Sequence, residues 1–115
     1  MSIVYVPNLP MRRDAATRKS IPSLDLNAAA HYGTLQRITE GPIDRPHVSD
    51  ALELARKAAR VFTNEDYVLA VGDALITAAL LYYITISQGA QRHPIKFLRY
   101  NRAVRRYDCV GVALW

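Results

Sequence analysis

The sequence predicts a compact three-layer α/β domain: a mostly parallel sheet, two crossover helices and a C-terminal antiparallel β-hairpin. Three observations predict it. An apolar run, Tyr67–Val71, leads through Gly72 and Asp73 into an apolar helix, which is half of a βαβ unit. An amphipathic helical pattern precedes this unit over residues 49–62. Two segments of strand character follow it after Pro94.

Size and composition favour one folded domain over residues 1–115. Half of the residues are hydrophobic, and glycine and proline are few. We expect residues 1–23 to form a strand plus a basic loop or arm, and residues 32–115 to form the core. The lone Cys109 has no partner for an intramolecular disulfide, which suits a reducing compartment such as the cytoplasm; the alternative is a disulfide between two chains. A lone cysteine on a strand is typically a buried core thiol.

The N-terminal segment begins with an alternating run, Ser2–Val6, which Pro7 stops, and this is typical of an edge strand. The following residues, 8–23, predict a loop that contains Pro10 and Pro22. Two interpretations of its basic residues stay open. They either belong to a solvated connector or form an arm along a nucleic-acid backbone. These residues are Arg12, Arg13, Arg18 and Lys19.

Residues 24–47 predict one strand between two irregular segments. Leu24–Ala30 is ambiguous, with Asp25 or Asn27 able to cap a single helical turn. Tyr32–Thr39 alternates as a strand does, and the glycine and prolines of residues 40–47 indicate a loop.

The first helix is expected to begin near Ser49 or Asp50, with Asp50 as the N-cap. Its basic residues, Arg56, Lys57 and Arg60, suit the helix C-terminus and a solvated face. Its buried face is expected to hold Val48, Leu52, Ala55, Ala59 and Phe62.

The strand Tyr67–Val71 is continuously apolar, as expected of a central strand covered on both faces. Gly72 or Asp73 then begins the second helix and Gly89 ends it. The apolar stretch of this helix, 74–87, is shorter than the ~17–25 residues that cross a bilayer, so we expect no membrane partner. One apolar stripe holds Leu75, Ala79, Tyr82 and Ile86, and its neighbour holds Ile76, Leu80 and Tyr83. The helix is therefore either buried in the domain or half in the domain and half in an oligomer interface.

The chain ends in a predicted hairpin: a strand over Ile95–Tyr100, a turn over 101–105 and a strand over Arg106–Leu114. The alternating Val110, Val112 and Leu114 are expected to form a buried face. Trp115 either anchors this last strand or projects into a partner.

Basic residues concentrate at the two ends of the chain. Residues 1–23 carry four basic residues and one acidic, residues 24–87 five and eight, and residues 88–115 six and one. This asymmetry suits an anionic partner. In the predicted nucleic-acid interface, basic side chains neutralise phosphates and exposed aromatic rings stack on unpaired bases. The predicted contact residues are Lys96, Arg99, Tyr100, Arg102, Arg105, Arg106, Arg12 and Arg13. The alternative is an edge hairpin whose charges prevent aggregation and whose aromatics face the core.

Other kinds of site have little support. The Gly72-Asp73 turn lacks the G-x-G-x-x-G pattern, and an aspartate there is better explained as the cap of its own helix. We therefore expect no cofactor. The three histidines are far apart and lack a second ligand at helical spacing, so no metal site is expected. The acidic pair Glu65-Asp66 indicates a polar turn, and no residues specify a catalytic site.

The segments EDYVLAVGDALI and IKFLRYNRAVRRYDCVGVAL resemble small, uncharacterised α/β proteins of tailed bacteriophages. The resemblance covers roughly the C-terminal half and brings no catalytic residues. It implies a viral accessory or structural role, in the host cytoplasm or the virion. The leading hypothesis is a non-enzymatic module that binds nucleic acid through the basic hairpin. The competing one is a protein-interaction or homo-oligomer module, as a viral structural protein or a modulator of a host protein, that uses helix 74–87 or an edge strand.

Overall fold

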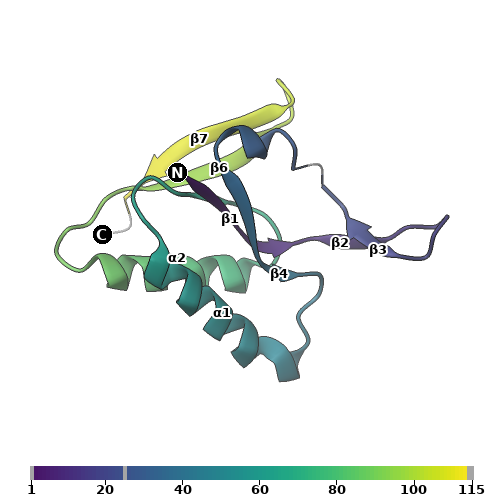
Figure 1. The fold of residues 1–115 in the computed structure, drawn as a ribbon, viewed down its shortest axis with the longest axis horizontal. Helices are drawn as coiled ribbons and strands as arrows, with labels where there is room; N and C mark the ends of the chain where they lie inside the picture. Colours follow the sequence, from purple (N-terminus) through teal and green to yellow (C-terminus); the bar gives the residue numbers. More distant parts are fainter. Residues whose placement is uncertain (1, 25, 114–115) are drawn as a thin grey trace.

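The computed structural model describes residues 2–24 and 26–113, and its centre is a five-stranded sheet of order β4-β1-β5-β6-β7 (Figure 1). The first four of these strands are parallel, and β7 runs antiparallel to β6. The predicted parallel sheet, helical crossovers and C-terminal hairpin are thus confirmed. The main elements are β1 (Ile3–Leu9), β4 (Thr34–Glu40), α1 (Val48–Val61), β5 (Tyr67–Leu69), α2 (Ala74–Gln88), β6 (Ile95–Asn101) and β7 (Arg106–Val112).

The strand β1 lies inside the sheet, between β4 and β5, so its assignment to an edge was wrong. It pairs with β4 along its length and with β5 at Val4 and Tyr5. The recorded pairing with β5 ends before Pro7, so the missing N–H of this proline breaks no pair on that side. The hydroxyl of Thr39 donates to the Pro7 carbonyl at 2.8 Å. The strand is buried from Val4 to Leu9, as its apolar sequence suits.

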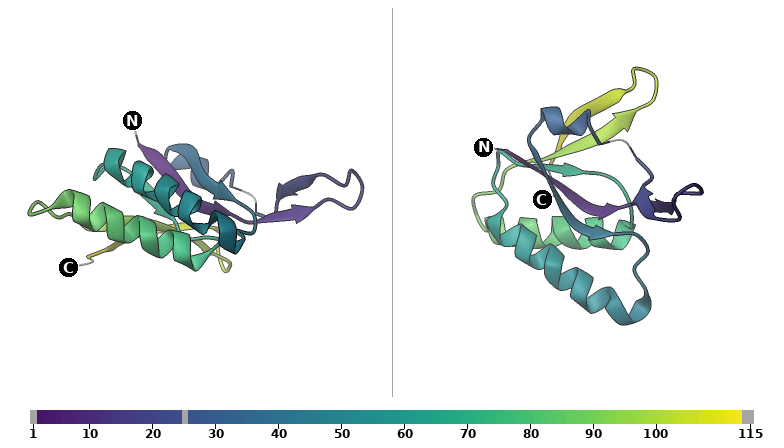
Figure 2. Two further views of the ribbon diagram at one scale, coloured as in Figure 1. Left: turned by 90° about the horizontal axis from the view of Figure 1, so that it is seen from below. Right: turned by 45° about the vertical axis from the view of Figure 1, so that its right-hand side comes forward.

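The segment predicted as a loop over residues 8–23 contains a second hairpin instead. β1 extends to Leu9, and the antiparallel pair β2 (Met11–Arg13) and β3 (Ser20–Pro22) follows. The turn is closed by the Arg18 N–H, which donates to the Asp14 carbonyl at 2.8 Å. This hairpin projects away from the sheet (Figures 1 and 2). Four basic residues are thereby carried on an ordered projection.

The two faces of the sheet are covered differently. Both helices lie on one face, where Ala51, Ala55, Ala59, Ile76, Leu80 and Ile84 pack on the strands (Figure 2). On the other face a thin layer around the 3₁₀ turn η1 (Ala29–His31) covers Val4, Val6, Leu69 and Leu98. The chain moves from β1 to β4 in one direction and from β4 to β6 in the other. Crossovers of one hand that move in opposite directions lie on opposite faces.

The helix termini follow the prediction at α2 but not at α1. Gly89 ends α2 with a φ of 59°. The first helix begins at Val48, one residue before Ser49, because a 3₁₀ turn, η2 (Arg45–His47), leads directly into it. The predicted N-cap was wrong, since His47 holds that position and Asp50 lies in the first turn. No helix among the described residues is long and apolar enough to cross a bilayer.

The last strand is less buried than predicted. Val110 and Val112 are exposed, and so is Cys109, so neither the buried valine face nor the core thiol is found. The reason is that β7 is the edge of the sheet and pairs with β6 alone among the described strands. The predictions for Leu114 and Trp115 concern residues outside the described part of the chain.

Candidate functional site

The parallel strands β4, β1, β5 and β6 all end on one side of the molecule, which we name the carboxyl end of the sheet. Two hairpins leave from it, because β1 continues into β2–β3 and β6 continues through residues 102–105 into β7 (Figure 2). Ligands of open α/β sheets bind at this end, where the strand order reverses direction. In this sheet the reversal lies between β1 and β5, and we name it the switch point.

The switch point is filled by the protein itself. The side chain of Asn8, 4% exposed, accepts a hydrogen bond from the Asp73 N–H at 2.9 Å. Its amide donates to the hydroxyl of Thr39 and to the carbonyl of Gly41, each at 2.9 Å. Gly72 has a φ of +81°, and a Cβ there would lie 1.9 Å from the Asn8 carbonyl oxygen. Only glycine therefore fits this close approach.

At the start of α2, too, a side chain of the protein itself forms the hydrogen bond to the backbone. The carboxylate of Asp73 accepts a hydrogen bond from the Leu75 N–H at 2.8 Å, so Asp73 is the N-cap, as predicted. The N–H groups that bind a phosphate at a helix start are partly occupied by this carboxylate, whose charge also opposes an anion. The switch point is thus a structural junction.

Beside this junction a cavity of about 560 Å³ opens between the tip of the β6–β7 hairpin, a side formed by Ser23, Leu24 and Ala28, and the residues after β5. We name it the arginine pocket. Its wall combines cationic, aromatic and small apolar side chains. The lining residues are Ser23, Leu24, Ala28, Ala70, Val71, Arg99, Tyr100, Arg102, Arg105 and Tyr107.

The aromatic part of the wall is held from behind. Tyr100 is 49% exposed, and its ring meets the buried ring of Tyr107 edge-on, with centroids 5.4 Å apart. The hydroxyl of Tyr32 donates to the Tyr107 carbonyl at 3.0 Å and links this strand to the covering layer. The pocket therefore offers a supported aromatic surface.

The turn that carries the arginines is ordered by Asn101. Its side-chain oxygen accepts from the Ala103 N–H at 3.0 Å, and its amide donates to the carboxylate of Asp108 at 3.0 Å. Asp108 is the one acidic residue of the hairpin, and it is engaged by this amide. Arg105 adopts a left-handed conformation, with a φ of 53°, so that the turn closes.

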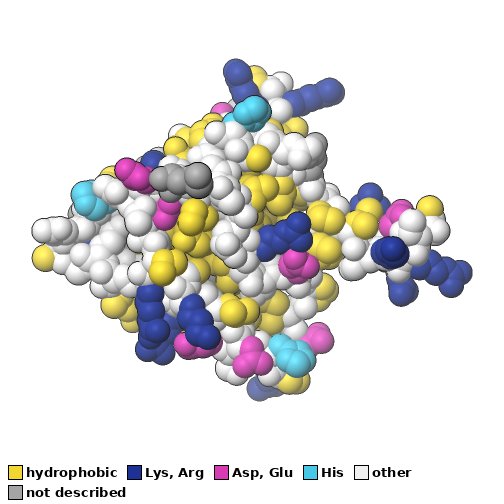
Figure 3. Space-filling view, viewed as in Figure 1, with side chains coloured by type: hydrophobic (Ala, Val, Ile, Leu, Met, Phe, Trp, Pro, Cys, Tyr) yellow, Lys and Arg dark blue, Asp and Glu magenta, His cyan; other side chains and the backbone are white. Residues whose placement is uncertain are grey.

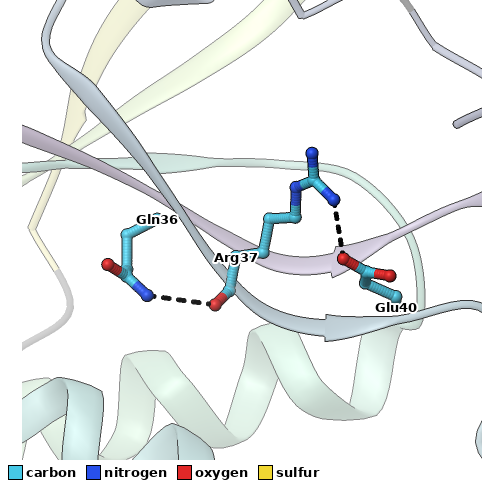
Figure 4. Close-up of polar contacts among 3 residues, drawn as sticks. All are labelled: Gln36, Arg37 and Glu40. Carbon is cyan, nitrogen blue, oxygen red and sulfur yellow. Dashed lines mark hydrogen bonds and ion pairs between the residues drawn. The ribbon is translucent and has the colours of Figure 1, made fainter.

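The hairpin arginines differ from Arg37 and Arg56, which both have acidic partners. Near the end of β4, Arg37 pairs with Glu40 at 2.7 Å (Figure 4). On α1, Arg56 pairs with Glu53 at 3.7 Å. Across residues 2–24 and 26–113 these are the ion pairs, and neither includes a residue of either hairpin. Figure 3 shows Lys and Arg side chains at the ends of both projections.

The predicted contact residues separate into three groups in space. Arg99, Tyr100, Arg102 and Arg105 meet at the arginine pocket, and Arg106 begins β7 beside it. The ammonium of Lys96 lies elsewhere, 4.2 Å from the ring centroid of Tyr67. Arg12 and Arg13 are exposed on β2 of the second hairpin.

Sequence reasoning missed the apolar side of the pocket. Leu24 and Ala28 reach it through the covering layer, and Val71 reaches it because β5 ends at Leu69 rather than at Val71. Residue spacing could not predict that these apolar side chains lie beside the hairpin arginines, since the segments are far apart in the chain. Only the order of the strands could have indicated it.

Within the described residues no three His, Cys, Asp or Glu side chains gather as a metal site would require.

Comparison with known proteins places the chain in a phage family. No curated protein and no solved structure matches the chain. One protein family, described as Phage Pam3 gp32-like protein, matches residues 2–114, which confirms the resemblance to phage proteins. The chain belongs to this Phage Pam3 gp32-like family.

Proposed function

We propose that this phage protein is an accessory protein that binds nucleic acid at the carboxyl end of its sheet. The β6–β7 hairpin supplies the main contacts, and the β2–β3 hairpin adds to them. The observation that carries the proposal is the arginine pocket, where three arginines line one cavity without an ion pair among the described residues. Arginines that neutralise phosphates release counterions, and this release drives binding.

Edge protection explains the hairpin charges less well. Charges that keep an edge strand from aggregating are expected along the open strand itself. Here Arg102 and Arg105 lie in the turn, whereas the open strand β7 continues as Asp108-Cys109-Val110-Gly111-Val112 without a basic residue. The arginines gather where a ligand would meet the pocket rather than where a neighbouring strand would pair.

The proposal is tested by the mobility of fluorescent DNA and RNA across a salt series. We expect the protein to retard both at low salt, and we expect the triple variant Arg102→Ala, Arg105→Ala, Arg106→Ala to bind more weakly. On double-stranded DNA its slope of log affinity against log salt should fall by up to ~0.9 per lost contact. A matched control removes three basic residues from the exposed side of α1: Arg56→Ala, Lys57→Ala, Arg60→Ala.

The control variant has the same change in net charge, so it separates local contact from overall charge. It should keep most of the affinity and nearly the parent slope. Absence of retardation at low salt would overturn the proposal. Equal weakening by the two triple variants would also contradict it, because net charge alone would then explain the binding.

A second candidate function is protein interaction or self-association through α2. Three large apolar side chains of this helix, Leu75, Tyr82 and Ile86, each expose more than half of their surface and lie on one stripe. Sedimentation over a concentration series, for the parent and Tyr82→Lys, tests it. The parent should associate and the variant should not. A parent that stays monomeric at every concentration would remove the case for self-association.

A further inference from the structure

We infer that the arginine pocket accepts one unpaired nucleotide of a single strand, so that the protein prefers single-stranded to double-stranded nucleic acid. This inference rests on the proposed function and adds the form of the ligand. Binding to a duplex needs only an array of cations along its backbone. A concave pocket with an aromatic wall is an additional feature, and it calls for a ligand that can enter it.

The size and lining of the pocket suit such a ligand. Its volume of about 560 Å³ is within the ~300–1,000 Å³ of sites that enclose small molecules. The wall offers cations for a phosphate and the half-exposed ring of Tyr100 for a base. Leu24, 42% exposed, and Val71 add apolar surface. A base inside a duplex is already stacked on both faces, so only an unpaired base can place its ring here.

The surroundings of the pocket favour a nucleotide within a strand over a free one. Further basic residues lie on the two hairpins that border it, with Arg106 at the start of β7 and Arg12 and Arg13 on β2. Ser23, which lines the pocket, is tied to the base of the β2–β3 hairpin, because its N–H donates to the Pro10 carbonyl at 2.9 Å. Neighbouring phosphates of a strand would meet these residues, and a free nucleotide would not.

Fluorescence anisotropy with a labelled single strand and with the duplex of the same sequence tests the inference. We expect the parent to bind the single strand about tenfold more tightly. Tyr100→Ala should weaken binding to the single strand about tenfold and to the duplex less than twofold, because it removes a stacking surface and no charge. Val61→Ala is the control, since Val61 is also exposed, at 65%, but lies at the end of α1, away from the pocket.

A second pair of variants adds a carboxylate inside and outside the pocket. Leu24→Glu places it among the arginines, and Leu54→Glu places it on α1, where the leucine is 46% exposed. We expect Leu24→Glu to lose the preference for the single strand and Leu54→Glu to keep it. Melting curves check that all four variants fold, which their exposed positions favour.

The outcomes separate this inference from the proposed function. Equal affinity of the parent for the two forms, or a uniform loss with Tyr100→Ala, would overturn the pocket inference and leave the proposed function standing. Absence of binding to either form would overturn both. A free nucleoside monophosphate that competes as well as an oligonucleotide would show a pocket for free nucleotides, and this would contradict binding within a strand.

Discussion

The switch point and the arginine pocket lie at the same end of one sheet, yet one is closed and the other is open. At the switch point, Asn8 makes three hydrogen bonds and the backbone of Gly72 lies against it. At the arginine pocket, three exposed arginines surround a cavity. The comparison teaches that the position where α/β sheets usually bind ligands is occupied here by the protein itself. The open site lies to one side, where the β6–β7 hairpin extends past the ends of the strands.

A substitution at Gly72, in the switch point, is expected to reduce the stability of the protein the most. Gly72→Ala should lower the free energy of unfolding by about 3 kcal/mol or more, because its Cβ would collide with the Asn8 backbone and its φ is positive. Urea denaturation measures this change. Gly89→Ala is the control, since Gly89 also has a positive φ but no atom within 4 Å of an added Cβ. It should cost less than Gly72→Ala, about 1–2 kcal/mol, because it adds backbone strain without a collision. Similar costs at both glycines would contradict the close packing of the switch point.

The next largest effect is expected at Asn8. Asn8→Ala should cost about 2–4 kcal/mol, because it leaves the N–H of Asp73 and the carbonyl of Gly41 without their partner in a partly buried site. Asn64→Ala, at an exposed asparagine, should change stability by less than about 0.5 kcal/mol. Thermal melting of the two variants checks the difference. If Asn8→Ala has the same melting temperature as the parent, the hydrogen bonds of the switch point do not contribute to stability.

The cap of α2 should contribute less. Asp73→Ala should cost about 0.5–2 kcal/mol, and Asp73→Asn should cost less because asparagine also caps a helix. The measurement is the urea midpoint of both variants beside the parent. A functional role would appear differently, as a loss of nucleic-acid binding in Asp73→Asn at an unchanged melting temperature.

The open side should respond least in stability. The combined variant Arg99→Ala, Arg102→Ala, Arg105→Ala should change the free energy of unfolding by less than about 0.5 kcal/mol, because these exposed arginines form no ion pair among the described residues. Under the proposed function, the same variant should lose most of its affinity for nucleic acid. Marked destabilisation would instead assign the arginines to the structure of the hairpin.

Local sequence pattern was enough to predict the elements that depend only on residues close together in the chain. The apolar run before Gly72, the cap at Asp73 and the glycine that ends α2 were predicted and found. Predictions of burial failed where burial depends on which other strands or helices lie beside the segment. Val110, Val112 and Cys109 carry a strand pattern, but β7 lies at the edge of the sheet, so these side chains are exposed. Alternation indicates a strand without saying what covers it.

The sequence by itself determined the α/β class, the unit from β5 through α2, the basic hairpin and the uneven distribution of charge. These depend on residues that are close in the chain. The tertiary structure decided that β1 is an interior strand, between β4 and β5, and that the β2–β3 hairpin projects. It also brought Leu24 and Val71 to the arginines of the β6–β7 hairpin. The physical reason is that strand order and crossover direction set which distant segments meet, and no local spacing encodes them.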